Sequence, residues 1–289
     1  MSWKSCMKQR SKTVKGFKKM KYLISTISDL AGEEVNGEEM RVFYEERTLP
    51  LAVENGLGLE FAEFCLTINM DENFESIRPD LERKATAVRL KTLHAPFNEL
   101  YPMAIDPKVV KIAYERYDQA WKLALRFGAE KLIVHPNFVF EYYFESWFVE
   151  RHVMFWKKFL AEHPEPVTIC LENVTEDDPS LILGILEEVN DPRLRMCLDV
   201  GHANLSPVPP IEWLKMYGSL ISHYHLHNNE GRKPGRRSNG DLHRALGNGI
   251  IDMKELLDTA ERLTPNATAA IESYEPEACV EWLKKNGYI

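Results

Sequence analysis

The chain has 289 residues, of which 44% are hydrophobic and 28% are charged. These proportions describe a globular protein with a sizeable core and exclude a disordered, collagen-like or membrane-embedded chain. The net charge is −8, but residues 1–21 hold eight basic and no acidic residues, so the 28 basic and 44 acidic residues of 22–289 give that part a charge of −16. A body this acidic disfavours non-specific binding to nucleic acid and to anionic membranes.

The N-terminal stretch and the spacing of the cysteines indicate in which cellular compartment the protein is located. Residues 1–20 are basic and lack the apolar core of a signal peptide, and the sequence has no run of about 18 apolar residues. We expect a dispensable extension, disordered or an artefact of the start site, ahead of one domain at residues 21–289. The cysteines are widely spaced without a C-x-x-C pair, which favours a reducing, cytoplasmic location: Cys6, Cys65, Cys170, Cys197 and Cys279.

Short apolar, β-rich runs alternate with longer helix-like segments along the chain. A helix is predicted over residues 106–126, because Asp-Pro opens this segment and Gly128 follows it. Eight βα units predict a parallel sheet closed into a single (βα)8 barrel, that is, a TIM barrel. An open doubly wound sheet is the alternative, but the Gly-rich turn of a dinucleotide site does not follow the first run. The predicted strands are residues 22–27, 58–66, 88–94, 131–135, 167–171, 194–198, 221–226 and 267–271.

Polar residues stand where these predicted strands end. The carboxyl ends of barrel strands open onto one face, so side chains distant in sequence can converge there and form an active site. Buried imidazoles and carboxylates in such numbers would be costly unless they shared cations, which makes metal coordination the simplest interpretation. The strand-end residues are His94, His135, Glu172, Asp199, His225 and Glu272, and His202, Asp241 and His243 join them from loops.

A structural interpretation stands beside this one, because a single histidine near a strand end is more often a hydrogen-bonded structural residue. The alternation of His223, His225 and His227 does not decide which of them would bind metal. Residues two positions before the polar ones are small or apolar, as the layer beneath a site requires, and Cys170 and Cys197 are therefore interpreted as barrel filling.

Several segments resemble those of the xylose isomerase-like barrel superfamily, which contains sugar isomerases, ketose epimerases and the endonucleases called endonuclease IV. The resemblance spans residues 21–289, and the order of the Leu-Glu-Asn and Leu-Asp-Val-Gly-His-Ala motifs is specific to the superfamily. The matching segments are Leu93-His-Ala-Pro-Phe, Val134-His-Pro, Leu171-Glu-Asn-Val, Cys197-Leu-Asp-Val-Gly-His-Ala, His225-Leu-His-Asn-Asn and His243-Arg-Ala-Leu-Gly-Asn-Gly.

The resemblance implies two alternative metal sites. The epimerase pattern places one divalent ion (Zn, Mn, Mg or Co) on Glu172, Asp199, His225 and Glu272, with His202 directed at the substrate. The endonuclease pattern extends the set to three zinc ions through His94, His135, His202, Asp241 and His243. His227 stands where those endonucleases have Asn.

Three functions follow from these patterns. The first is a metal-dependent isomerase or epimerase of a small sugar or sugar phosphate, in which Glu172 and Glu272 move the proton, or a hydride shifts instead. His202 and His94 would bind its substrate, and a homo-oligomer is compatible with the sequence. The second is a multinuclear zinc phosphoesterase, and the third is a catalytically idle binding barrel.

A basic loop bears on the substrate. Arg232, Lys233, Arg236 and Arg237 lie in a Gly- and Pro-containing loop between His225 and Asp241, at the predicted active face. Arg232 and Arg236 are predicted to bind a substrate phosphate, whose geometry a guanidinium matches, and a solvated loop is the alternative. The aromatic residues of 138–148 follow the fourth strand, where they line a sugar pocket or, as we expect, pack against helices.

Overall fold

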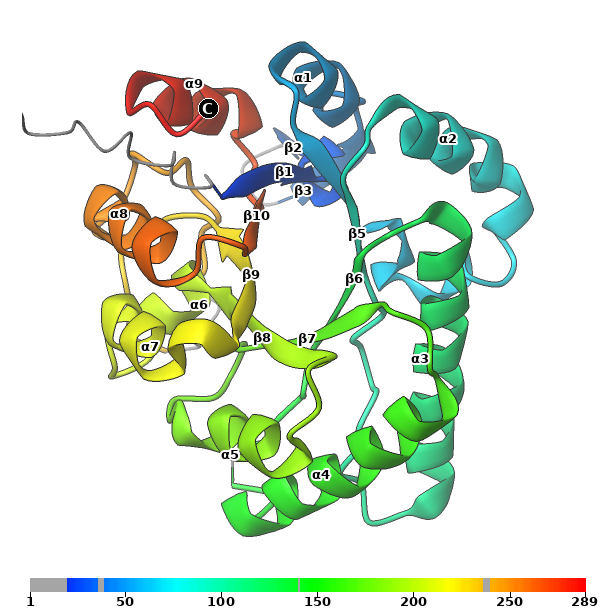
Figure 1. Cartoon of the computed structure of the whole chain (residues 1–289). Helices are drawn as coiled ribbons and strands as arrows, with labels where there is room; N and C mark the ends of the chain where they lie inside the picture. The colour runs from blue at the N-terminus through cyan, green and yellow to red at the C-terminus, as the bar shows by residue number, and fades with distance from the viewer. Residues whose placement is uncertain (1–19, 36–38, 140, 236–239) are drawn as a thin grey trace, which may run out of the picture.

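Eight parallel strands close into a barrel in the computed structural model, which describes residues 20–35, 39–139, 141–235 and 240–289 (Figure 1). The strands run in the order β1-β10-β9-β8-β7-β6-β5-β4, and pairing of β1 with β4 closes the ring. The predicted (βα)8 barrel is therefore confirmed. The barrel strands are β1 Lys21–Ser25, β4 Gly58–Phe61, β5 Lys91–His94, β6 Lys131–Val134, β7 Thr168–Glu172, β8 Leu194–Asp199, β9 Ile221–Leu226 and β10 Thr268–Ile271.

The helices surround this barrel as an outer layer (Figure 1). Their apolar faces pack on the outward faces of the strands in one large hydrophobic core. The helices are α1 Thr48–Asn55, α2 Phe74–Ala87, α3 Pro107–Phe127, α4 Glu145–Glu162, α5 Ser180–Val189, α6 Val200–Asn204, α7 Pro210–Tyr217, α8 Met253–Leu263 and α9 Pro276–Lys285. Short 3-10 helices are η1 Thr26–Asp29, η2 Glu63–Cys65, η3 Thr67–Asn69 and η4 Gly218–Leu220.

Helix α3 shows why the sequence predicts this layer well. The Asp106 side chain caps its first turn by accepting a hydrogen bond from the Lys108 backbone N–H at 2.8 Å. Gly128 ends the helix in the left-handed conformation, with φ 67°, which residues with a β-carbon rarely adopt. The predicted bounds of 106–126 are thus within one residue of the observed helix.

Two predicted strands are shorter than expected. The run at 58–66 forms β4 only as far as Phe61, because the Thr26 hydroxyl accepts the Ala62 N–H at 2.8 Å and the chain then turns into η2. The run at 88–94 becomes strand only from Lys91. An antiparallel hairpin of β2 Leu30–Val35 and β3 Glu39–Tyr44 follows η1 and was not predicted.

The interior of the barrel holds a separate small cluster of Ile133, Cys170 and Cys197, all fully buried. This placement matches the interpretation of both cysteines as barrel filling. The predicted extension lies outside the described residues except for Met20. None of the helices in the described ranges is long and apolar enough to span a membrane.

Candidate metal centre and active site

The polar residues predicted at the strand ends gather at one mouth of the barrel. They line a cavity of about 290 Å³ whose remaining wall is formed largely by Ile27, Cys65, Phe97, Val174 and Tyr274. Asp199 and His225 lie behind the lining residues and are fully buried. The predicted site residues that line the cavity are His94, His135, Glu172, His202, Asp241, His243 and Glu272.

The central group consists of Glu172, Asp199, His225 and Glu272, whose ligand atoms lie within 4.8 Å of one another. The Nδ1 atom of His225 is 3.2 Å from Glu272 Oε2, 3.3 Å from Glu172 Oε2 and 3.8 Å from Asp199 Oδ2. These residues come from β7, β8, β9 and the position after β10. The barrel therefore brings together all four residues that the epimerase pattern implies.

His225 provides the test of whether a metal fits this group. Its Nδ1 atom is buried and has no hydrogen-bond partner, although three carboxylates lie around it. A buried imidazole nitrogen without a hydrogen bond costs free energy, and burying three carboxylates beside it costs more unless positive charge accompanies them. A divalent cation would satisfy the nitrogen and the carboxylates together, and the mixture of nitrogen and oxygen donors suits Zn, Mn or Co.

Two further groups flank the central one. His94 and His135 each place Nε2 3.2 Å from Glu172 Oε2, and the three residues could hold a second ion. On the other side, His202 Nε2 is 3.3 Å from Asp241 Oδ2, and His243 Nε2 is 3.4 Å from Asp241 Oδ1. The nine residues of the endonuclease pattern thus fall into three contiguous groups of ligand atoms.

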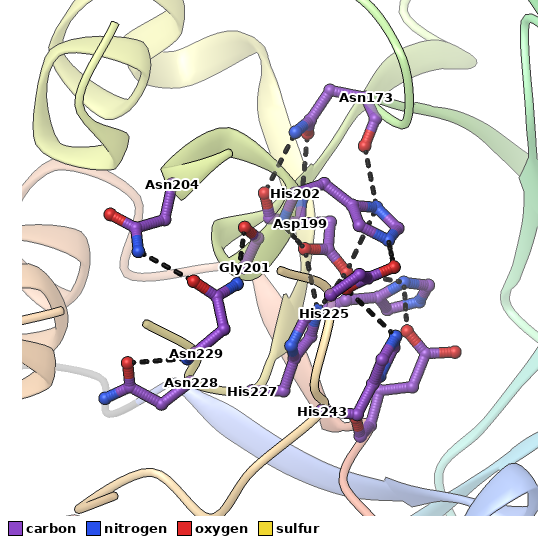
Figure 2. A network of polar contacts seen from close by, with 12 residues as sticks. Asn173, Asp199, Gly201, His202, Asn204, His225, His227, Asn228, Asn229 and His243 are labelled. Carbon is purple, nitrogen blue, oxygen red and sulfur yellow. Dashed lines mark hydrogen bonds and ion pairs between the residues drawn. The ribbon is translucent and has the colours of Figure 1, made fainter. Parts of the chain in front are cut away.

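His227 joins the third group, which the sequence alone could not decide. Its Nε2 atom lies 3.1 Å from Asp199 Oδ1, and its ring stacks on His243 with centroids 3.8 Å apart. Figure 2 shows His227 between Asp199 and His243. Gly201 makes room for it, because a β-carbon at that position would lie 2.0 Å from the imidazole.

Asn173, directly after β7, links the Leu-Glu-Asn and Leu-Asp-Val-Gly-His-Ala motifs (Figure 2). Its side chain donates to the Asp199 carbonyl and accepts from the Asp199 N–H, both at 2.9 Å, which couples the ends of β7 and β8. Its carbonyl lies 3.0 Å from His202 Nδ1. Asp199 also caps α6 by accepting the His202 N–H at 2.6 Å. The Leu-Glu-Asn and Leu-Asp-Val-Gly-His segments therefore position one another.

The loop that carries His243 is held in an uncommon conformation. His243 has φ 42°, in the left-handed region that costs free energy for a residue with a β-carbon. Its Nδ1 atom lies 2.8 Å from the Glu272 carbonyl, and its own carbonyl accepts the Tyr274 N–H at 3.2 Å. These contacts fix the imidazole over the cavity and join the loop to the segment after β10.

Charges within the site shift the pKa values of its groups. Burial alone would raise the pKa of Glu172, but the imidazoles of His225 and His135 hold it well below its ordinary value. Burial would lower the pKa of His243, whereas Asp241 and Glu272 raise it to about 9. The carboxylates are therefore ionised at neutral pH, which is the state that coordinates a cation.

The basic loop lies apart from the cavity in its described part. Arg232 Nη1 is 2.9 Å from Asp177 Oδ2 on the surface, and Lys233 Nζ is 2.6 Å from Glu230 Oε2. Arg236 and Arg237 lie outside the described residues. Phosphate binding by Arg232 and Arg236 therefore stays a prediction. Of the aromatic segment, Phe148 is buried in the helix layer, as expected, and Tyr142 is exposed.

Two buried polar residues lie below the site, of which Glu60 was not predicted and His223 was left undecided between a metal ligand and a structural residue. Glu60 on β4 and His223 on β9 are fully buried, and Glu60 Oε1 lies 2.9 Å from Nε2 of His225. The available signal was the charged residue within the apolar Gly-Leu-Glu-Phe run. Glu60 lies within β4, whereas the prediction rests on polar residues at strand ends.

The fold and the site define a (βα)8 barrel whose mouth carries side-chain groups that could hold metal ions. The family described as a xylose isomerase-like TIM barrel matches residues 55–285, and the chain belongs to this family. A curated relative, the uncharacterized protein MJ1311 of Methanocaldococcus jannaschii, is 27% identical over 193 residues, which are 63% of this chain and 63% of the relative. The match therefore spans less than two thirds of that relative's length.

Solved structures have the same fold. A D-tagatose 3-epimerase-like protein superposes with a TM-score of 0.71 at 21% identity, over 92% of this chain and 97% of that one. The IolI protein, solved with a zinc atom bound, superposes with a TM-score of 0.69 at 17% identity, over 93% and 96% of the two chains.

Proposed function

We propose that this protein is a divalent-metal-dependent isomerase or epimerase of a small sugar or sugar phosphate. One observation carries the proposal: Glu172 at the end of β7 and Glu272 after β10 both border the cavity, and both lie within 3.3 Å of His225 Nδ1, which has no hydrogen-bond partner. The names of the similar structures support the reaction class, since one is called a D-tagatose 3-epimerase-like protein.

The two glutamates perform the proton transfer in this proposal. One carboxylate removes the proton from the carbon beside the substrate carbonyl, and the other returns a proton to complete the reaction. A bound divalent cation would polarise the carbonyl oxygen and stabilise the negative charge that develops there. Asp199 is fully buried and serves as a ligand only, while Glu172 and Glu272 also face the cavity and can reach a substrate.

The remaining polar residues of the cavity orient the substrate. His94 and His202 line the cavity and offer imidazole nitrogens to substrate hydroxyls. The wall formed by Ile27, Phe97 and Val174 is apolar and packs against the carbon skeleton of the substrate while limiting its size. Arg232 and Arg236 extend the proposal to a phosphorylated substrate.

Proton transfer at carbon gives the direct test. The protein, reconstituted with Mn²⁺ or Co²⁺, is incubated in D₂O with a panel of ketopentoses and ketohexoses and their phosphates, and products are examined by NMR and mass spectrometry. We expect one substrate to give an epimer or isomer with solvent deuterium at the exchanged carbon. Conversion without deuterium would replace proton transfer by a hydride shift, and no conversion with any member would contradict the proposal.

Phosphoester hydrolysis is the second candidate function. It is favoured by the two groups that flank the central one, because three neighbouring ions could clamp the attacking and leaving oxygens of a phosphodiester. Cleavage of a duplex containing an abasic site by the zinc-loaded protein, with no conversion of any sugar, would select this function. Sugar binding without either reaction would select an idle binding barrel.

A further inference from the structure

A column of polar side chains runs through the barrel interior below the metal site. It consists of Lys131 at the start of β6, Thr268 at the start of β10, His223 on β9 and Glu60 on β4, and it ends at His225. All five residues are buried, and His223, Glu60 and His225 are fully so. An apolar layer is the usual content of a barrel at this depth, so a charged column requires a reason.

The column consists of hydrogen bonds from Lys131 to His223, followed by close approaches of the Glu60 carboxylate to the imidazoles of His223 and His225. Lys131 Nζ donates to the Ser222 carbonyl and lies 2.7 Å from Thr268 Oγ1. Thr268 Oγ1 is hydrogen-bonded to His223 Nδ1, and His223 Nε2 lies 3.0 Å from Glu60 Oε2. Glu60 Oε1 lies 2.9 Å from His225 Nε2. His225 then turns its other nitrogen, Nδ1, to the metal-site carboxylates.

Donor chemistry gives this column a direction. A lysine side chain donates hydrogen bonds, so Thr268 Oγ1 accepts from Lys131 and its own hydroxyl proton is left to donate to His223 Nδ1. Among the described residues, that buried proton has no other acceptor. His223 therefore carries its proton on Nε2, the nitrogen that lies 3.0 Å from Glu60 Oε2.

Glu60 also determines which nitrogen of His225 carries the proton. An ionised carboxylate only accepts, and Oε2 already faces His223 and receives the Thr92 hydroxyl at 2.8 Å. Oε1 lies 2.9 Å from His225 Nε2, and neither atom has a hydrogen-bond partner elsewhere among the described residues. Placing the proton of His225 on Nε2 is thus the arrangement that leaves the lone pair of Nδ1 free.

We propose that the column Lys131–Thr268–His223–Glu60 fixes the tautomer of His225, so that Nδ1 presents its lone pair to the metal. Glu60 and Thr268 are positioning residues that act through His225, and neither touches the substrate cavity. This inference rests on the proposed metal site. A carboxylate behind a metal-ligating histidine commonly changes metal affinity by about 10- to 100-fold.

Glu60→Gln tests the contact between Glu60 and His225, because it can place a hydrogen-bond donor where the carboxylate offers an acceptor. The amide has one accepting oxygen and one donating nitrogen, so it can serve only one of the two imidazoles as Glu60 does. Because Thr268 holds His223 as a donor, the amide nitrogen must face His225, where it disfavours a proton on Nε2. We expect Zn²⁺ affinity, measured by competition with a chromophoric chelator, to fall by about 10- to 100-fold.

A double variant separates this mechanism from the loss of a negative charge. Thr268→Val removes the hydroxyl that holds His223, which can then reverse its tautomer and leave the oxygen of the introduced amide for His225. We therefore expect Glu60→Gln with Thr268→Val to bind Zn²⁺ more tightly than Glu60→Gln alone, by at least about threefold, although no charge is restored. Thr92→Val is the matched control, because it removes another hydroxyl from the same carboxylate and should give no recovery.

A spectroscopic measurement on the unmodified protein completes the test. NMR of ¹⁵N-histidine-labelled, Zn²⁺-loaded protein should show that His223 carries its proton on Nε2. Melting curves of every variant check that it is folded. A proton on His223 Nδ1, an unchanged Zn²⁺ affinity in Glu60→Gln, or equal recovery with Thr92→Val would each overturn the inference. So would a Zn²⁺ ion bound within the column by Cys197, His223 and His225, which also lie close together. Absence of any Zn²⁺ binding would instead overturn the proposed function, and the His223 tautomer would still be measured in the zinc-free protein.

Discussion

The helix layer and the barrel mouth both bury histidine, but they satisfy it in different ways. In α4, His152 Nε2 lies 3.0 Å from the Pro136 carbonyl, and His152 Nδ1 accepts the Trp156 N–H at 3.2 Å. Each nitrogen of this neutral ring has one suitable partner. At the mouth, His225 Nδ1 has three carboxylates around it and no hydrogen bond. Burial is the same in both regions, and only the partners differ.

This difference teaches what marks a metal ligand. A ring with one acceptor and one donor partner is complete without an ion, and burial then lowers the pKa of His152 to about 3. The ring of His225 is not completed in this way, because Nδ1 makes no hydrogen bond, and a divalent cation would satisfy that nitrogen and the carboxylates together. The comparison therefore predicts that metal binding and proton transfer depend on the barrel mouth. It also predicts that the loss of stability at acid pH depends in part on the helix layer.

The largest effect is expected from Glu172→Gln and Glu272→Gln. Each change keeps the shape of the side chain but removes a proton-transfer group and a ligand, so turnover should fall by about 10²- to 10⁴-fold. Rates are measured on the substrate found in the D₂O screen, at saturating metal. Glu187→Gln, on the exposed face of α5, is the matched control and should keep its rate. Retention of more than a tenth of the activity by either site variant would refute the acid–base assignment.

Metal removal is expected to have the next largest effect, on stability. A ligand that binds only the folded state at about 100 times its Kd stabilises by about 2.7 kcal/mol. Chelation should therefore lower the melting temperature by several degrees, and readdition of Mn²⁺ or Zn²⁺ should restore it. Asp199→Asn should make the melting curve less sensitive to the chelator. A curve that does not respond to chelation in the unmodified protein would argue that the mouth is complete without an ion.

The helix layer should show a pH effect of similar or smaller size. Because the pKa of His152 is about 3 in the folded state and about 6.5 in an unfolded chain, the unfolded state takes up the proton first as the pH falls. Stability is therefore lost as pH drops below about 6.5, by about 2 kcal/mol at pH 5. The physical cause is burial, which removes the hydration of a charged imidazolium, and a proton added to Nδ1 would also face the Trp156 N–H.

His152→Gln isolates this contribution in urea unfolding at pH 7 and pH 5, with metal present. The amide can donate to the Pro136 carbonyl and accept from Trp156 without titrating, so the variant should lose about 2 kcal/mol less than the unmodified protein between the two values. Equal losses would show that His152 is not a source of the acid sensitivity.

The smallest effect on stability is expected in the basic loop. Arg232→Gln removes an exposed pair with Asp177, which should cost at most about 1 kcal/mol. If the loop recognises phosphate, replacing Arg232, Lys233, Arg236 and Arg237 by Gln should raise KM for a phosphorylated substrate, change kcat less and spare the free sugar. If the change alters KM for neither the phosphorylated substrate nor the free sugar, the loop is a solvated loop without a role in binding.

Much of the fold was predictable because it depends on local patterns. The eight apolar runs, and caps such as Asp106 and Gly128, recur at the spacing of βα units, and each run overlaps a barrel strand. The end of β4 was not predictable, because it is set by a hydrogen bond to Thr26, which comes from another part of the chain. The hairpin of β2 and β3 was missed because the whole segment after the first strand was interpreted as a connection.

The residues of the site at strand ends and in loops were predictable, whereas the polar residues below them were not. Nine residues at strand ends and in loops follow from barrel geometry and from motif resemblance, and the structure groups them together. Glu60 and His223 lie within strands, where period-two alternation places a side chain inside the barrel but does not say what it contacts. Lys131 likewise meets Thr268 only because β6 and β10 face each other across the interior.

Metal stoichiometry tests the central claim most directly. Protein stripped with a chelator is titrated with Mn²⁺ and Zn²⁺, and bound metal is counted by mass spectrometry, with Asp199→Asn in parallel. We expect one tightly bound ion per chain, lost or much weakened in Asp199→Asn, as a sugar isomerase or epimerase with a single ion on Glu172, Asp199, His225 and Glu272 requires. Three ions per chain would favour the phosphoesterase, and no bound ion would contradict the metal centre itself.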